Sequence, residues 1–303
     1  MTHICFIIGN GFDLDLGFPT SYVDFANPKN KEWNDFVNMT GTIIKDCFQT
    51  EFVNHMKNAQ IYEKWFDIEN EILKFANFHK NLNIHKVGLI RLQYEALVKS
   101  IQSYIFRVAI LQNKRTGSFA ENLLRKLNES KWPVMIYSFN YTDCFKISGI
   151  VKNRTIKMNH IHGSLSYNMA LGCRPYGEFA INTQLDFLYK STERKTKELL
   201  QNLSSASEVI VFGHSLNEID FCYFDDFFHS FIKGICQCKN LTIVCKDEKS
   251  EDEIKRRLKK NGIDFSLLKR NVNVKFICTD SWYEKDDITL KIYDDICNRL
   301  SIC

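Results

Sequence analysis

The feature that most constrains the fold is a glycine-rich turn near the start of the 303-residue chain. The apolar run Ile4–Ile8 leads directly into Gly9, Asn10 and Gly11, and Asp13 follows shortly after. A short apolar strand that ends in such a turn and enters a helix is typical of a nucleotide-binding βα unit. Glycine lets a phosphate approach the backbone N–H groups, but the third glycine of the usual dinucleotide fingerprint is missing. The turn alone favours nucleotide binding and a plain tight turn about equally.

Later in the chain, short apolar runs alternate with amphipathic segments. The runs predict strands at Pro133–Ser138, Thr155–Ile161, Val209–Phe212, Leu241–Cys245 and Val272–Cys278. The amphipathic segments predict helices near 118–127, 191–203, 217–232, 250–261 and 284–300. This alternation predicts an α/β fold with a mostly parallel sheet, covered by helices on both faces.

The segment between the first strand and the rest of the sheet has a different pattern. Residues 32–113 show helical spacing of apolar side chains and little strand signal, with the longest helix predicted from His85 to Gln112. We therefore expect a single α/β domain over residues 1–303, with residues 32–113 as a helical insertion or subdomain that could form a lid.

Composition excludes several classes of protein. A hydrophobic fraction of 45% and a charged fraction of 25% are ordinary for a globular protein, and a net charge of +4 makes nucleic acid an unlikely ligand. The eleven cysteines are odd in number and show no zinc-ribbon spacing, which favours buried free thiols. Neither a signal peptide nor an apolar run of the roughly 20 residues needed to span a membrane is visible, so we expect a cytoplasmic protein without a membrane partner.

Four polar clusters each follow directly after an apolar run: Gly9–Asp13, Asn140–Asp143, His162–Ser164 and Gly213–Asp220. In an open α/β sheet, ligands bind outside the carboxyl ends of the strands. The four clusters are therefore expected to converge on one crevice although they lie far apart in the sequence.

Each cluster contains a residue suited to part of a reaction. Asn140 can orient a water or a hydroxyl with its amide, and Gly213 and Ser215 suit a second phosphate or a ribose. His162 has an unperturbed pKa suited to proton transfer at neutral pH. If His162 is buried, loss of hydration lowers its pKa and keeps it neutral.

Structural roles compete with these interpretations. His162 could be held by a neighbouring carbonyl, and Asn140 could be a turn residue. A metal site that uses His160, His162 and His214 is a further alternative, but no carboxylate or thiol spacing supports it.

These motifs together resemble a known family. I-G-N-G-F-D at Ile8–Asp13, F-N-Y-T-D at Phe139–Asp143, H-I-H-G-S at His160–Ser164 and F-G-H-S-L-x-E-I-D at Phe212–Asp220 are similar to the bacterial abortive-infection family AbiH. The W-x-D-x-E of Trp65–Glu69 also fits. The resemblance spans residue 4 to about residue 228 and implies a role in phage defence.

The same order of motifs is more remotely similar to the sirtuin-like NAD-binding superfamily. There, a glycine-rich loop runs to a proline, as Gly9–Pro19 does, and a strand ends in an Asn near an Asp, as Asn140 and Asp143 do. A His-Gly and a Gly-x-Ser follow, as at His162 and Gly213–Ser215. This resemblance implies a sirtuin-like Rossmann fold with His162 and Asn140 as catalytic candidates. The four-cysteine zinc module of sirtuin deacylases is missing here, which argues against deacylation.

The resemblance further implies a set of binding residues for NAD: Gly9, Asn10, Gly11, Asp13, Asp143, Gly213, His214, Ser215 and Asp220. The leading hypothesis is an NAD glycohydrolase that cleaves the nicotinamide–ribose bond and uses no metal. The alternatives are a nucleotide-binding sensor without turnover and, less favoured, a metal-dependent nuclease or nucleotidase. The expected partners are a small-molecule nucleotide, a phage-derived trigger and a second copy of the chain in a homo-oligomer.

Overall fold

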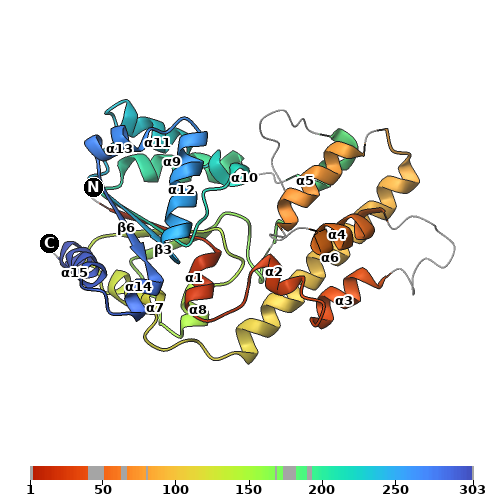
Figure 1. Cartoon of the computed structure of the whole chain (residues 1–303), viewed down its shortest axis with the longest axis horizontal. Coiled ribbons are helices and arrows are strands. Elements are labelled where there is room, and N and C mark those ends of the chain that lie inside the picture. Colours follow the sequence, from red (N-terminus) through yellow and green to blue (C-terminus); the bar gives the residue numbers. More distant parts are fainter. Residues whose placement is uncertain are drawn as a thin grey trace. The chain divides into compact units, whose positions relative to one another are not determined.

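The computed structural model describes residues 3–39, 51–62, 67–79, 81–167, 169–172, 182–189 and 193–301. The chain divides into two compact units, both traced in Figure 1. Met1–Phe18, Asn113–Ser164 and Thr192–Cys303 form the first unit, and Pro19–Gln112 and Leu165–Ser191 form the second.

The first unit contains a six-stranded sheet in the order β3-β2-β1-β4-β5-β6, in which all neighbouring strands are parallel. The strands are β1 (Ile4–Ile8), β2 (Val134–Ser138), β3 (Ile156–His160), β4 (Glu208–Phe212), β5 (Asn240–Cys245) and β6 (Asn273–Cys278). This order is that of the dinucleotide-binding Rossmann fold, with a switch point between β1 and β4. The predicted parallel α/β fold is confirmed, and its more specific likeness to sirtuin-like domains stays a prediction.

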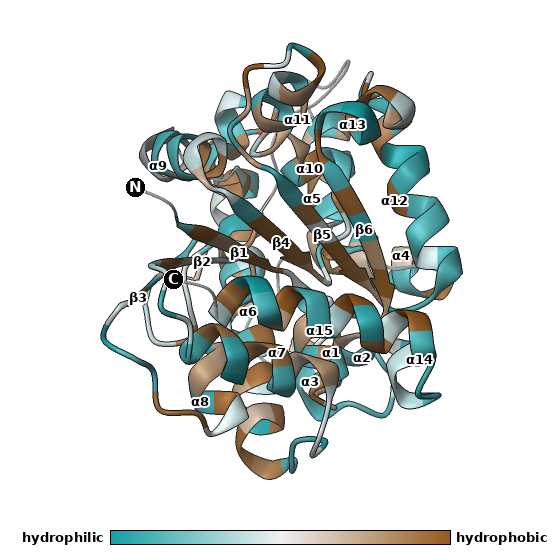
Figure 2. Ribbon diagram, turned by 90° about the vertical axis from the view of Figure 1, so that its left-hand side faces the viewer, coloured by the Kyte–Doolittle hydropathy of each residue, from teal (hydrophilic) through white to brown (hydrophobic). Residues whose placement is uncertain are grey.

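Helices cover both faces of this sheet, as Figure 2 shows with α9, α11 and α12 on one side and α7 and α15 on the other. The helices of this unit are α1 (Asn10–Asp15), α7 (Phe119–Asn128), α8 (Cys144–Ser148), α9 (Glu193–Ser205), α10 (Glu218–Phe221), α11 (Asp225–Ile232), α12 (Glu248–Lys260), α13 (Phe265–Asn271), α14 (Thr279–Tyr283) and α15 (Asp287–Ser301). Because both faces are covered, β1 and β4 are buried along their whole length.

One helix prediction was wrong. The segment 217–232 was expected to form a single helix, but it forms α10 and α11 with a break between them. The chain leaves the helical path at Cys222–Phe224, and Phe221, Tyr223 and Phe224 around this break are all buried.

The second unit is helical. It contains α2 (Tyr22–Phe25), α3 (Lys31–Val37), α4 (Glu51–Tyr62), α5 (Ile68–Phe78), α6 (Ile84–Leu111) and the 3₁₀ helix η2 (Thr183–Leu188). The long helix predicted from His85 to Gln112 is present as α6. The single-domain organisation and the role of residues 32–113 as a lid stay predictions.

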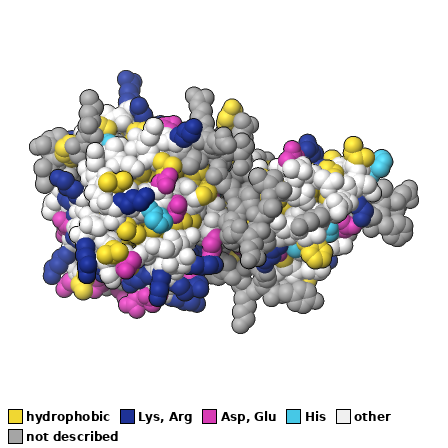
Figure 3. Space-filling model, turned by 90° about the horizontal axis from the view of Figure 1, so that it is seen from above, with side chains coloured by type: hydrophobic (Ala, Val, Ile, Leu, Met, Phe, Trp, Pro, Cys, Tyr) yellow, Lys and Arg dark blue, Asp and Glu magenta, His cyan; other side chains and the backbone are white. Residues whose placement is uncertain are grey.

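The mixed charges on the surface and the buried free cysteines are those expected from the composition. Figure 3 shows a face on which Lys and Arg side chains are interspersed with Asp and Glu. Cys5, Cys245 and Cys278 are buried and free, as predicted. Within the part of the chain that the structure describes, every helix is too short or too polar to cross a membrane.

Candidate functional site

The carboxyl ends of the central strands are aligned. Ile8 at the end of β1 pairs with Ser138 at the end of β2 and with Phe212 at the end of β4, and Ser138 pairs with His160 at the end of β3. The loops that follow these strands therefore begin side by side. The register brings together the polar clusters that the sequence places far apart.

The loops after β1 and β4 are in close contact, and glycine makes that contact fit. A Cβ on Gly9 would lie 2.5 Å from the Cα of His214, and one on Gly11 would lie 2.6 Å from the Cα of Gly213. Gly213 also has φ of +61°, a left-handed conformation that side chains disfavour. These three glycines are thus required by the packing of two loops against each other at the switch point.

Hydrogen bonds hold the same two loops together. The N–H of Gly9 donates to the carbonyl of Phe212, and the N–H of Gly11 donates to the carbonyl of Gly213, both at 2.9 Å. Phe12 points into the core, where its ring meets those of Phe6 and Phe212 edge to face. The glycine loop is therefore already bonded to β4, and its predicted contact with a phosphate stays a prediction.

A buried polar network joins the loop after β1 to the loop after β2. Nδ2 of Asn140 donates to Asp13 Oδ1 at 2.8 Å and to the carbonyl of Gly9 at 3.1 Å. The other carboxylate oxygen of Asp13 accepts from the hydroxyl of Thr142 at 2.6 Å. Asp13 is 1% exposed and Asn140 is 7% exposed, so these bonds form away from bulk water, where they are strongest.

The backbone of Asn140 is held as well. Its N–H donates to Ser138 Oγ at 3.2 Å, and its carbonyl lies 3.0 Å from Nδ1 of His160. Because a carbonyl oxygen only accepts, Nδ1 of His160 must carry the proton. His160 thus supports Asn140, whereas His162 lies beyond the end of β3 and belongs to a second cluster.

This second cluster consists of two histidines on either side of one carboxylate. Nε2 of His162 lies 3.4 Å from Asp220 Oδ1, and Nε2 of His214 lies 3.7 Å from Asp220 Oδ2. Nδ1 of His214 accepts the N–H of Leu216 at 3.0 Å, so a neutral His214 carries its proton on Nε2, facing Asp220. An imidazole whose neighbouring carboxylate fixes its orientation is suited to proton transfer.

Aromatic rings surround these histidines. The ring of Phe139 lies 5.2 Å from that of His162 and 4.4 Å from that of His214, and both contacts are edge to face. The ring of Tyr223 lies 5.9 Å from that of His162, and Phe224 packs against His214 at 5.1 Å. The cluster therefore lies in a low-polarity setting, which strengthens the interaction of its charges.

The remaining predicted residues take other positions. Asp143 caps α8 by accepting the N–H groups of Phe145 and Lys146, and Asn10 is the first residue of α1. The side chain of Ser215 is exposed, and its carbonyl accepts a hydrogen bond from Arg257. In the second unit, Asp67 caps α5. Trp65 lies outside the described residues.

Sequence reasoning missed three supporting residues: Ser138, Thr142 and Leu216. Thr142 lies within the F-N-Y-T-D motif, so its place in the motif was an available signal. Leu216 has φ of +48°, which is rare for leucine and leaves no mark in the sequence.

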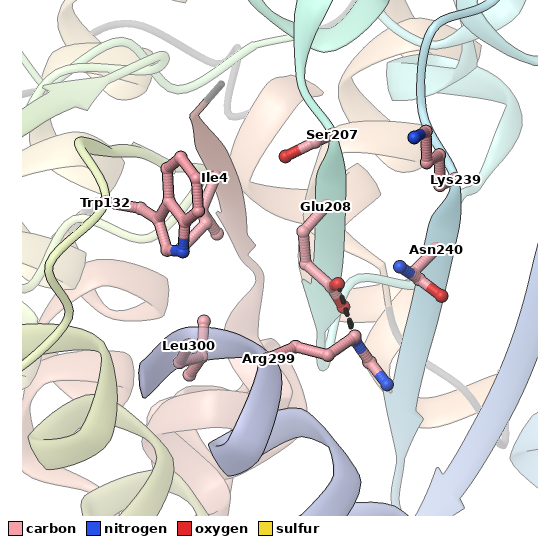
Figure 4. A pocket seen from close by; sticks show the side chains of 8 residues that line it. All are labelled: Ile4, Trp132, Ser207, Glu208, Lys239, Asn240, Arg299 and Leu300. Carbon is pink, nitrogen blue, oxygen red and sulfur yellow. Dashed lines mark hydrogen bonds and ion pairs between the residues drawn. The ribbon is translucent and has the colours of Figure 1, made fainter. Parts of the chain in front are cut away.

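One cavity described in this unit lies at the other end of the strands. It has a volume of about 120 Å³ and is lined by residues that include Ile4, Glu208 and Asn240, which begin β1, β4 and β5. Figure 4 shows Arg299 of α15 reaching Glu208, with which it forms a two-fold ion pair at 2.9 Å. Burial raises the pKa of Glu208, and the ion pair opposes that shift. This cavity is therefore separate from the candidate site.

The comparisons with known proteins give one match. A family model described as "Bacteriophage abortive infection AbiH" matches residues 5–239, a segment that contains Asn140, His162 and Asp220. The comparisons with curated proteins and with solved structures find no match. Among the described residues, no group of three or more His, Cys, Asp or Glu side chains is placed to hold a metal ion.

Proposed function

The chain belongs to the bacteriophage abortive infection family AbiH, and from this premise we propose that it acts by hydrolysing the nicotinamide–ribose bond of NAD. Membership of the family gives the chain a role in abortive infection. The choice of NAD comes from the resemblance of the motif order to sirtuin-like domains and from the strand order of the sheet.

The observation that carries the proposal is the meeting of two polar clusters at the switch point. Gly9 touches both clusters, because its carbonyl accepts from Asn140 while its Cα packs against His214. A ligand at the ends of β1 to β4 would thus meet the amide of Asn140, which follows β2, together with His162, which follows β3, and Asp220, which follows β4. Ligands of doubly wound sheets bind at this position.

In the proposed reaction, the protein has two tasks: it positions the substrate and the attacking water, and it supplies one general base. The C1′–N bond breaks with its electron pair passing to the pyridinium nitrogen, which leaves neutral nicotinamide and a ribosyl cation of oxocarbenium character. Asn140 Oδ1 would accept a hydrogen bond from the attacking water or a ribose hydroxyl. His162 would take the proton of that water, and Asp220 would stabilise the resulting imidazolium. The products are nicotinamide, ADP-ribose and one proton.

The test is release of nicotinamide from NAD by the purified protein, compared with His162→Ala and with His229→Ala as a matched control. His229 is a partly exposed histidine of α11 that pairs with Asp225 and takes no part in the cluster of His162, His214 and Asp220 that the structure describes. Loss of a general base reduces turnover by about 10²–10⁴-fold. We expect this loss for His162→Ala and unchanged turnover for His229→Ala. Full activity of His162→Ala would refute the role of the base.

A second candidate is a nucleotide sensor without turnover, which the burial of the histidines favours. His162 is 3% exposed and His214 is 5% exposed, so a structural role beside Asp220 suits them too. A sensor predicts that NAD or another nucleotide raises the melting temperature through binding to the folded state while no nicotinamide is released.

A further inference from the structure

We infer that Asp13 is a positioning residue that fixes the side-chain amide of Asn140 and leaves its Oδ1 as the acceptor for a hydroxyl or water of the ligand. The identity of that ligand rests on the proposed function. The hydrogen bonds that carry the inference are independent of it.

The first argument is the state of the polar groups of Asn140. Its backbone N–H and carbonyl are engaged by Ser138 and His160, and Nδ2 has two acceptors for its two hydrogens. The remaining polar atom of Asn140 is Oδ1, which accepts no hydrogen bond from the residues that the structure describes. An amide fixed at every group but one can present that group to a ligand without loss of further conformational freedom.

The second argument is the chemistry of Asp13. Its carboxylate has only acceptors, so Asp13 Oδ1 can face Nδ2 of Asn140 and not Oδ1 of that amide. The bond is charge-assisted, and the hydroxyl of Thr142 holds the second carboxylate oxygen in place. A flipped Asn140 would put its oxygen against a carboxylate, which is repulsive. Asp13 thus selects one of the two amide orientations.

The third argument is burial. Asp13 is 1% exposed, and its two carboxylate oxygens accept hydrogen bonds from the neighbouring side chains of Asn140 and Thr142. The assignment therefore changes the role predicted for Asp13 from a ligand contact to a support of Asn140.

The experiment uses the whole chain labelled with ¹⁵N-asparagine and measures solvent exchange of the Asn140 side-chain NH₂ group, identified by its loss in Asn140→Asp. The variants are Asp13→Ala, which removes the acceptor, and Asp13→Asn, which keeps an acceptor without the charge. The matched control is Asp15→Ala, because Asp15 is another buried carboxylate of α1 and is bonded instead to Tyr283 and Ala120.

Loss of a hydrogen bond to a charged partner should speed exchange by about tenfold or more in Asp13→Ala. We expect a smaller change in Asp13→Asn and none in Asp15→Ala. Wild-type exchange in Asp13→Ala would overturn the inference, and so would equal acceleration in Asp15→Ala, since that would indicate general loosening of α1. Should Asp13→Ala fail to fold, Thr142→Val and its conservative counterpart Thr142→Ser test the same network, with acceleration expected only for Thr142→Val.

Turnover separates this inference from the proposed function. If the wild type releases nicotinamide, Asp13→Ala should lower kcat more than it changes KM, and Asp13→Asn should recover part of the loss. If the wild type releases none, the proposed function fails while the exchange result still decides whether Asp13 positions Asn140.

Discussion

The contact between the loops after β1 and β4 can be tested with a single methyl group. In Gly213→Ala the new Cβ would lie 2.4 Å from the Cα of Gly11 and 2.6 Å from the nitrogen of Phe12. These are backbone atoms, so no side-chain rotation relieves the overlap. Gly234→Ala is the control, because Gly234 has a similar φ of +67° but no described atom within 4 Å of the new Cβ.

The magnitudes follow from the two geometries. An alanine in the left-handed region costs about 1–2 kcal/mol of stability, and this is the whole expected cost of Gly234→Ala. Overpacking adds about 1–3 kcal/mol, so Gly213→Ala should cost about 2–5 kcal/mol. The difference between the two variants isolates the contact at the switch point.

The assay is hydrogen exchange of the peptides that contain β1 and β4, followed through a urea titration and combined with thermal melting. For a unit of this size, about 1 kcal/mol corresponds to about 2–4 °C in melting temperature. We expect β1 and β4 to lose protection at lower urea in Gly213→Ala than in Gly234→Ala. Equal loss of stability in the two variants would refute the packing argument.

Two further predictions concern carboxylates outside the site. Burial alone would raise the pKa of Glu121, but hydrogen bonds from Lys114 and Arg125 outweigh it and hold the pKa at about 2. The stability that Glu121 contributes is therefore complete above its unfolded pKa and is lost as pH falls toward about 2. Between pH 5 and 3.5, the difference in unfolding free energy between wild type and Glu121→Gln, measured by urea titration, should shrink by about 1 kcal/mol. A constant difference would contradict this. In Tyr283→Phe, the buried carboxylate of Asp15 loses a 2.8 Å hydrogen bond and the unfolding free energy should fall by about 1–3 kcal/mol, whereas an unchanged urea midpoint would refute the role of that bond.

Much of the fold could be predicted because its strands carry a local signal. Each of the strands was located with its ends within one residue, since short apolar runs such as Ile4–Ile8 and Val209–Phe212 are bounded by turn residues. Short helices with weak periodicity, such as α13 and α14, gave no such signal.

The alignment of the strand ends could be predicted, but the contacts between the loops that follow them could not. Parallel strands bring their carboxyl ends to one edge, which was enough to expect Asn140, His162 and Asp220 near each other. Asp13 contacts Asn140, and Gly11 contacts Gly213, because of the strand order and register. The local sequence determines neither the strand order nor the register. Gly9 and Gly11 are the clearest example. Their motif suggests a phosphate-binding loop, but the close packing of the loop after β4 also explains why both residues are glycine.

The central claim is that this chain destroys NAD during abortive infection, and the most direct test is the NAD content of infected cells. Cells that express the wild type and are protected from a phage should be compared with cells that express His162→Ala or His229→Ala. We predict that NAD falls after infection in wild-type and His229→Ala cells, with protection, and that His162→Ala loses both effects. Protection by the wild type with an unchanged NAD content would contradict the account.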